Sequence, residues 1–288
     1  METNDINNIE YHAPESKEKL ETINPTPDNP PWNVWAAFGV WIASVLFIVV
    51  FPSLVFLPYL AKQQIDFTNK EAILEFAKTD PTAVLLQIVS VIPAHIFTLF
   101  LAWLVVTRFR KYSFREMLGW KWGGFNVLHG LAILGGFFII AAVTSYFVPE
   151  QDNDLLRMLK TSRGAVIAIA FLATFTAPLV EEVVYRGLLY SALQRGFGLT
   201  TSVILTTLFF AAVHVPQYYP SFSTIFLICL LSLVLTLVRV KTGNLLPCVV
   251  LHTIFNGIQS ILLILQPYFP ENPADLPEKT ASVIHLFK

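Results

Sequence analysis

Acidic, basic and histidine side chains lie inside strongly apolar stretches of the second half of the chain, where they could do chemistry. Ionisable groups at membrane depth are costly, so a chain that keeps them there does so for a reason. They fall into three clusters with defined spacing. The clusters are residues 181–187 (EEVVYRG), residues 210–214 (FAAVH) and residues 252–256 (HTIFN).

The first cluster contains two adjacent carboxylates that the helical period separates. Glu182 and Arg186 are four residues apart and share a helix face, which predicts a salt bridge between them. Glu181 points about 100° away from Glu182 and keeps a free carboxylate. The spacing leaves a second interpretation open, in which the whole cluster is only the hydrated end of a helix.

The other two clusters place histidine in helices that are otherwise apolar. His214 ends a short predicted helix, and His252 lies one turn before Asn256 on the same helix face. His and Asn side chains also join helices within membranes by hydrogen bonds. Each cluster taken alone therefore fits a packing role as well as a functional one.

Together the clusters supply Glu181, His214, His252 and Asn256 from three helices that could meet at one point. A carboxylate and a histidine can activate a water, and further hydrogen-bond donors can stabilise an oxyanion. Glu181, His214 and His252 could equally bind a divalent metal such as zinc. No HExxH or other compact metal motif supports a metal site, and both alternatives stay open.

The remaining polar residues of the apolar stretches have weaker support as site residues. His95 and Gln87 in the second predicted span, and His129 in the third, fit packing or cavity roles. Cys248 lies one turn before His252, so a thiolate nucleophile is an alternative. Its neighbours are strongly apolar, which favours the neutral and unreactive thiol.

The composition assigns these clusters to a membrane protein. Of the 288 residues, 55% are hydrophobic and 14% are charged, against about 25% charged in average soluble domains. The net charge of −1 argues against nucleic acid as a partner, and two cysteines exclude a disulfide framework. The sequence predicts an all-α, polytopic transmembrane helical bundle with an active site within the membrane.

Seven stretches are apolar and long enough to span a bilayer. They cover residues 35–60, 81–106, 125–147, 164 to beyond 178, 200–215, 224–240 and 245–265, with a short surface helix predicted within 61–80. The predicted domains are a disordered acidic tail (1–31), N-terminal transmembrane helices (32–160), a catalytic transmembrane core (161–265) and a flexible C-terminal tail (266–288).

Basic residues in short loops predict the orientation of the bundle. The loop 107–124 holds five of them, which are Arg108, Arg110, Lys111, Arg115 and Lys121. Since basic loops stay in the cytoplasm, we expect this loop and the N-terminus to lie on the cytoplasmic side.

The three clusters resemble, in order and spacing, the EExxxR, FxxxH and HxxxN motifs of the CAAX-protease and bacteriocin-processing family. This family includes the Rce1-type CAAX prenyl endopeptidases and the lysostaphin-resistance-A-like (Abi) bacterial proteins. The segment 241–256 (KTGNLLPCVVLHTIFN) also resembles the family's approach to its last motif. The resemblance spans about residues 165–260, so residues 1–120 gain nothing from it.

The resemblance implies an intramembrane endopeptidase. It gives Glu181 and His214 the role of activating the attacking water, and it gives His252 and Asn256 the role of stabilising the oxyanion. Both a glutamate-dependent mechanism and a metalloprotease mechanism are argued for the family. A divalent metal therefore stays open as a cofactor.

The resemblance also gives Glu182 and Arg186 a structural or supporting role. It implies a peptide or protein substrate, which could be anchored in the lipid bilayer. Eukaryotic relatives act on prenylated CaaX proteins, whereas bacterial relatives are linked to peptide maturation, immunity or regulated proteolysis. The short loops of this chain favour a multi-pass protein of a bacterial plasma membrane.

Two functions from other classes stay open. A non-catalytic immunity or scaffold protein could use the same fold, but it would not need the complete set of Glu, His, His and Asn. A transporter could line its path with the same charges. The sequence contains no internal repeat, which counts against the transporter.

Overall fold

Seven helical segments run the length of the molecule. The computed structural model describes residues 24–268, and every regular element in that range is a helix. Seven segments in this range are long and apolar enough to span a membrane, which confirms the predicted all-α, polytopic fold. They are Val34–Leu60, Pro81–Thr107, Val127–Phe147, Arg163–Phe197, Leu199–Tyr218, Phe222–Thr242 and Leu246–Leu265.

Two of the seven spans are interrupted. In the second span, α3 (Pro81–Val89) and α4 (Val91–Thr107) meet at Ser90, because Pro93 has no N–H to bond to the carbonyl of Val89. The fourth span is a chain of five pieces, two of which are π-helical turns. The pieces are α8 (Arg163–Phe171), η1 (Leu172–Thr176, π), α9 (Ala177–Glu182), η2 (Val183–Leu189, π) and α10 (Tyr190–Phe197).

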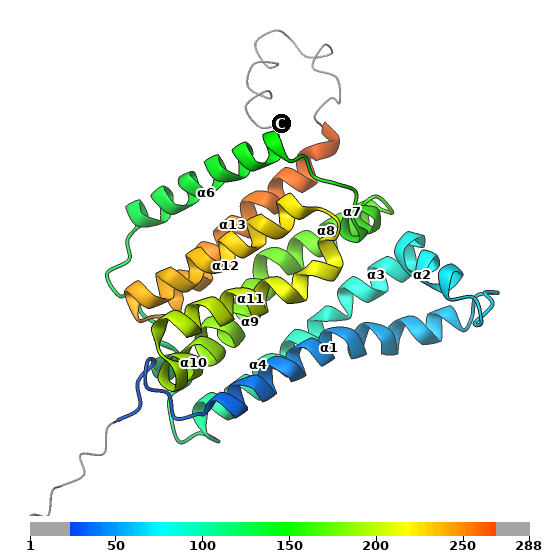
Figure 1. Ribbon diagram of the computed structural model, residues 1–288. Coiled ribbons are helices and arrows are strands. Elements are labelled where there is room, and N and C mark those ends of the chain that lie inside the picture. The colour runs from blue at the N-terminus through cyan, green and yellow to red at the C-terminus, as the bar shows by residue number, and fades with distance from the viewer. Residues whose placement is uncertain (1–23, 269–288) are drawn as a thin grey trace, which may run out of the picture.

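The N-terminal helices form one layer of the bundle. α1 (Val34–Leu60) packs along α3 and α4, and Figure 1 shows these three helices side by side. Trp41 of α1 contacts Phe209 of α11 (Leu199–Tyr218), with ring centroids 5.1 Å apart, which joins this layer to the second half of the chain. The predicted surface helix is present as α2 (Lys70–Thr79).

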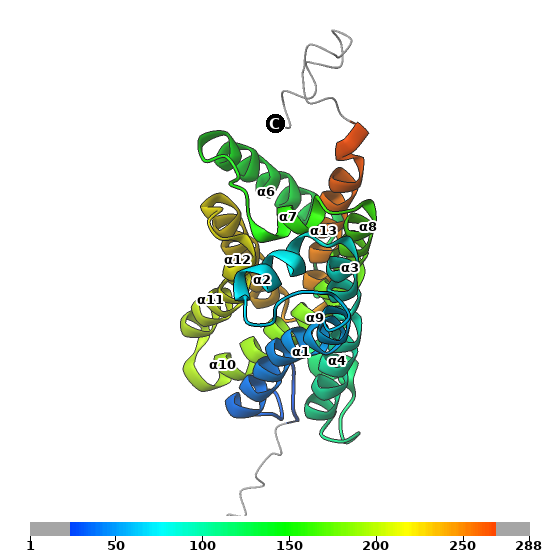
Figure 2. The same cartoon turned by 90° about the vertical axis from the view of Figure 1, so that its right-hand side faces the viewer.

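The second half of the chain surrounds the short helix α9. α9 contacts α4 on one side and α13 (Leu246–Leu265) on the other, as Figure 2 shows. α12 (Phe222–Thr242) packs against both α11 and α13. α6 (Val127–Phe147) lies at the outer edge of the bundle, where it contacts α12 and α13.

A loop fixes the beginning of α13. α5 (Phe114–Leu118) ends at Gly119, whose φ of +70° is in the left-handed region that favours glycine. The backbone N–H of Leu245 donates to the carbonyl of Gly119 at 2.9 Å. A Cβ atom at Gly119 would lie 2.9 Å from Cα of Asn244, so this close approach requires glycine. The contact sets where α13 starts.

Residues 24–32 lie against the end of the bundle that carries α10. The indole Nε1 of Trp32 donates to the carbonyl of Leu188 at 3.1 Å, and Asp28 pairs with the buried Arg239 at 2.9 Å. Composition placed residues 24–31 in the disordered tail, whereas the structure holds them by these contacts. The polar composition of residues 24–31 does not reveal that one of them, Asp28, pairs with a buried arginine. Residues 1–23 and 269–288 of the predicted tails lie outside the described residues.

Ion pairs tie two short helices together at the opposite end of the bundle. α7 (Asp154–Leu159) contributes Asp154, which pairs with Lys78 of α2 at 2.7 Å. Arg157 of α7 pairs with Glu75 of α2 at 2.9 Å. These contacts link the N-terminal layer to the second half of the chain outside the spans.

Candidate active site

α9 presents two adjacent carboxylates to different surroundings. The side chain of Glu182 is 0% exposed, whereas that of Glu181 is 23% exposed. Because a helix turns about 100° per residue, neighbouring side chains face different helices. One carboxylate is therefore sealed in the core and the other is open to a small molecule such as water.

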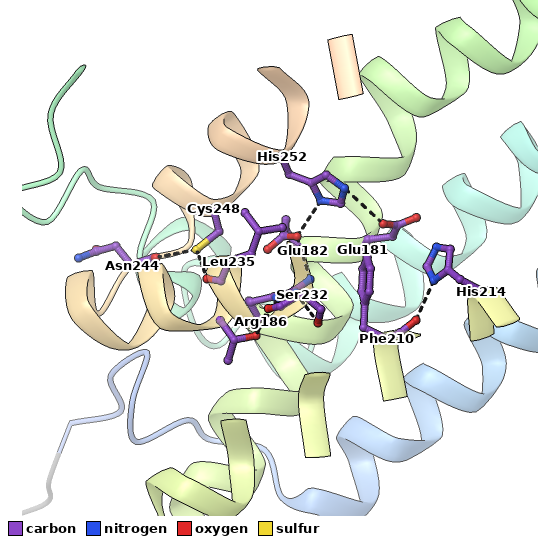
Figure 3. Close-up of polar contacts among 11 residues, drawn as sticks. Glu181, Glu182, Arg186, Phe210, His214, Ser232, Leu235, Asn244, Cys248 and His252 are labelled. Carbon is purple, nitrogen blue, oxygen red and sulfur yellow. Dashed lines mark hydrogen bonds and ion pairs between the residues drawn. The ribbon is translucent and has the colours of Figure 1, made fainter. Parts of the chain in front are cut away.

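Glu182 accepts two hydrogen bonds on one oxygen. Its Oε1 accepts from Nη1 of Arg186 at 2.9 Å and from Nδ1 of His252 at 2.8 Å (Figure 3). The ion pair with Arg186 confirms the prediction from the i,i+4 spacing. The bond to His252 was not predicted, because 70 positions separate the two residues in the sequence.

Arg186 joins this part of the fourth span to α12. Its Nη2 donates to the carbonyl and the hydroxyl of Ser232, both at 2.8 Å, and its Nε donates to Thr236 at 3.3 Å. The guanidinium also lies over the ring of Phe210, 4.7 Å from the ring centroid. A fully buried arginine needs such partners, since an unpaired buried charge is strongly destabilising.

His252 lies between the two carboxylates. Its Nδ1 carries a hydrogen, because the Glu182 carboxylate can only accept. Its Nε2 faces Oε2 of Glu181 at 3.8 Å, which is longer than a hydrogen bond. Glu182 therefore orients the imidazole, and the opposite ring nitrogen points to the open carboxylate (Figure 3).

His214 comes from α11 and is oriented by its own helix. Its Nδ1 donates to the carbonyl of Phe210 at 2.7 Å, which leaves Nε2 as the free ring nitrogen. In Figure 3 the carboxylate of Glu181 lies between the rings of His252 and His214. Within residues 24–268, Glu181 makes no direct hydrogen bond or ion pair with His214.

Asn256 completes a polar stripe on α13 that faces the π turn η1. Its Nδ2 donates to the carbonyl of Ala173 at 2.8 Å. The backbone N–H of Ala177 bonds to Leu172 in the π register, and the next bond in that register would join residue 178 to Ala173. Pro178 has no N–H, so Asn256 supplies the missing donor. One turn further on, Ser260 accepts from the hydroxyl of Thr174 at 2.9 Å.

Residues 163–258 match the family model of the type II CAAX prenyl endopeptidase Rce1-like proteins. This match supports the resemblance of the region to the CAAX-protease and bacteriocin-processing family. The match includes all three clusters and leaves out α1, α3, α4 and α6. Searches of curated proteins and of solved structures gave no match.

The match to the Rce1-like family model supports protease activity in general terms, with a peptide substrate and a lipid environment. Seven apolar spans make the protein an integral, multi-pass membrane protein. The three motifs meet around α9, because His252 bonds to Glu182 and Phe210 packs against Arg186. Their individual chemical roles remain proposals.

The geometry bears on two alternatives that the sequence left open, a thiolate nucleophile at Cys248 and a bound metal ion. Cys248 is fully buried, and its Sγ contacts the carbonyl of Leu235 at 3.4 Å, on the side toward α12 (Figure 3). Among the described residues, no three His, Cys, Asp or Glu side chains are grouped so that they could hold a metal ion. The candidate metal ligands Glu181, His214 and His252 thus do not form such a group.

The helices outside the family match also contact this site. His95 of α4, expected to be a packing or cavity residue, is buried and lies 2.9 Å from the hydroxyl of Thr176 through its Nδ1. Trp41 of α1 donates from Nε1 to the hydroxyl of Tyr185 at 3.1 Å. The sequence signal for His95 was only its residue type within an apolar helix, which does not separate packing from function.

Proposed function

We propose that the chain is an intramembrane endopeptidase in which Glu181 and His214 activate the attacking water. The observation that carries the proposal is the different environment of the two adjacent carboxylates. Glu182 is engaged by Arg186 and His252, whereas Glu181 is partly exposed and has its nearest ionic neighbour at 3.8 Å. Glu181 is therefore the carboxylate that a water can reach.

Glu181 and the free Nε2 of His214 can hold that water from two sides. In the attack, Glu181 takes a proton from the water, and the oxygen forms a bond to the carbonyl carbon of the peptide. The carbonyl electron pair moves to the oxygen and makes an oxyanion. The electron pair of the oxyanion then re-forms the carbonyl as the C–N bond breaks, and the leaving amine takes up the proton from Glu181, either directly or through Nε2 of His214.

We assign the stabilisation of the oxyanion to His252 and Asn256. His252 donates from Nδ1 to Glu182, so it can donate to an oxyanion only from Nε2 in its imidazolium form. Asn256 uses one Nδ2 hydrogen for the carbonyl of Ala173 and keeps the second for the oxyanion. Glu182 and Arg186 support the site by orienting His252.

The proposed substrate is a peptide or protein that reaches the site within the bilayer, and it could be anchored there. A divalent metal would be an alternative source of the activated water, but its candidate ligands Glu181, His214 and His252 are not grouped as a metal site in the described part of the chain. We further propose a bacterial plasma membrane as the location, on the basis of the short loops between the spans.

A proteolysis assay in detergent with a peptide library tests this function. We expect Glu181→Gln to abolish cleavage and to melt at the same temperature as the wild type, because Glu181 makes no short contact in the core. The matched control is Glu182→Gln, which removes a buried charge from Arg186 and should lower the melting temperature.

Two further experiments test the thiol nucleophile and the metal-activated water. Cys248→Ala should cleave normally, and an inactive Cys248→Ala beside an active Glu181→Gln would assign the nucleophile to the thiol. Reversible loss of cleavage with a chelator would assign the activated water to a metal. A wild-type protein that cleaves no peptide of the library would favour the non-catalytic scaffold.

A further inference from the structure

His95 makes a specific hydrogen bond to the turn that precedes the catalytic carboxylates. Its Nδ1 lies 2.9 Å from Oγ1 of Thr176, the last residue of the π turn η1. The hydroxyl of Thr176 donates its hydrogen to the carbonyl of Leu172 at 3.3 Å. Thr176 must therefore accept from His95, and the neutral imidazole carries its hydrogen on Nδ1.

Two helices hold the π turn η1 from different directions. His95 reaches Thr176 from α4, and Asn256 reaches the carbonyl of Ala173 from α13. One contact comes from the half of the chain outside the family match, and the other comes from the last family motif. The turn is thus fixed by side chains rather than by its own backbone alone.

The π turn decides which carboxylate faces the site. A π turn contains about one residue more than an α turn, and each helical residue corresponds to about 100° of rotation. If η1 relaxed to an α-helical turn, α9 would rotate by about the angle that separates Glu181 from Glu182. The backbone hydrogen bonds of η1 do not by themselves prevent the turn from relaxing to an α-helical one.

We propose that His95 is a positioning residue for Glu181, which acts by holding Thr176 and with it the π register of η1. The inference rests on the proposed role of Glu181 in activating water. It assigns the N-terminal helices a function in the reaction beyond covering the core. If His95 only fills space, kcat should not depend on its N–H donor. If His95 positions Glu181, loss of that donor should lower kcat.

Four substitutions separate these roles. Asn can place its amide nitrogen near the position of Nδ1, whereas the longer Gln places it near Nε2. We expect His95→Asn to retain most activity, and His95→Ala, His95→Gln and Thr176→Val to lower kcat about tenfold, the effect of losing about one hydrogen bond. KM should change little, because the substrate does not contact these residues.

The matched control is Thr98→Val, on the same helix as His95. The hydroxyl of Thr98 is buried and has no hydrogen-bond partner among the described residues, so the isosteric valine should leave kcat unchanged. The double variant of His95→Ala and Thr176→Val should be no slower than the slower single variant, because both remove the same bond.

Each remaining outcome has one meaning. An active wild type with a fully active His95→Ala overturns this inference and leaves the proposed function intact. A His95→Asn variant as slow as His95→Ala makes the imidazole itself the required group and overturns the positioning role, as do additive effects of His95→Ala and Thr176→Val. An active Glu181→Gln variant overturns the proposed function first.

Discussion

α6 and α13 are similar as sequences and different in the folded protein. They contain 21 and 20 residues, and both are apolar enough to span a membrane. In α6 only Phe137 is buried, whereas α13 buries six residues and carries the polar stripe His252, Asn256 and Ser260. Hydropathy therefore identifies a span, but the spacing of its polar residues identifies the helix to which we assign a role in the reaction.

The largest difference between the two helices should appear in a pair of histidine variants. His252→Ala on α13 removes the group between Glu181 and Glu182, and we expect kcat to fall by at least about 10²–10³. His129→Ala on α6 removes a capping contact to Asn126 and a ring contact with Phe125, both away from Glu181, so kcat should not change. Measuring the cleavage rates of the two purified variants tests this difference in kcat.

Equal loss of activity in the two histidine variants would contradict the assignment of the site to α13. A melting curve of each variant is the control. His129→Ala should cost about 1 kcal/mol or less, since it weakens one helix cap. A His252→Ala variant that no longer folds would be replaced by His252→Gln, whose amide keeps a polar group in the site.

The local part of this site could be predicted from the sequence. The Glu182–Arg186 pair follows from a spacing of four residues, and the seven spans follow from hydropathy. The bond between Glu182 and His252 joins α9 to α13, and helix packing rather than sequence spacing brings the two together. The same holds for His95 and Thr176, which come from different halves of the chain.

The π turns could not be predicted from the sequence either. Pro178 signals that a backbone carbonyl loses its donor, but it does not say whether an α or a π turn precedes it. That choice depends on Asn256, which supplies the donor to Ala173 from another helix. The contacts of residues 24–31 could not be predicted for a similar reason. Asp28 is held by an ion pair with Arg239, which is distant in the sequence.

A second pair of variants compares packing on the two helices. Leu251 of α13 is 3% exposed, whereas Ile139 of α6 is 67% exposed. Leu251→Ala should lower the free energy of unfolding by about 2–5 kcal/mol, because it leaves a cavity in the core. Ile139→Ala should change the free energy of unfolding by no more than about 0.5 kcal/mol, since most of the residue lies outside the protein core. Thermal melting of both variants in one detergent checks this, and equal effects would show that α6 packs as tightly as α13.

A smaller effect than that of Leu251→Ala is expected at the contact that joins the two helices. Phe137 and Phe138 of α6 meet Phe255 of α13, with ring centroids 4.6 Å and 5.4 Å apart. Phe137→Leu keeps an apolar side chain but removes the aromatic pairs with Phe138 and Phe255, of which the closer pair alone should contribute about 0.5–1.5 kcal/mol to stability. Phe255 precedes Asn256 in the sequence. A fall in kcat whose free-energy equivalent exceeds this loss of stability would mean that α6 also helps to position the site. An unchanged kcat with a small loss of stability would keep α6 as a lipid-facing helix that only anchors the outer edge of the bundle.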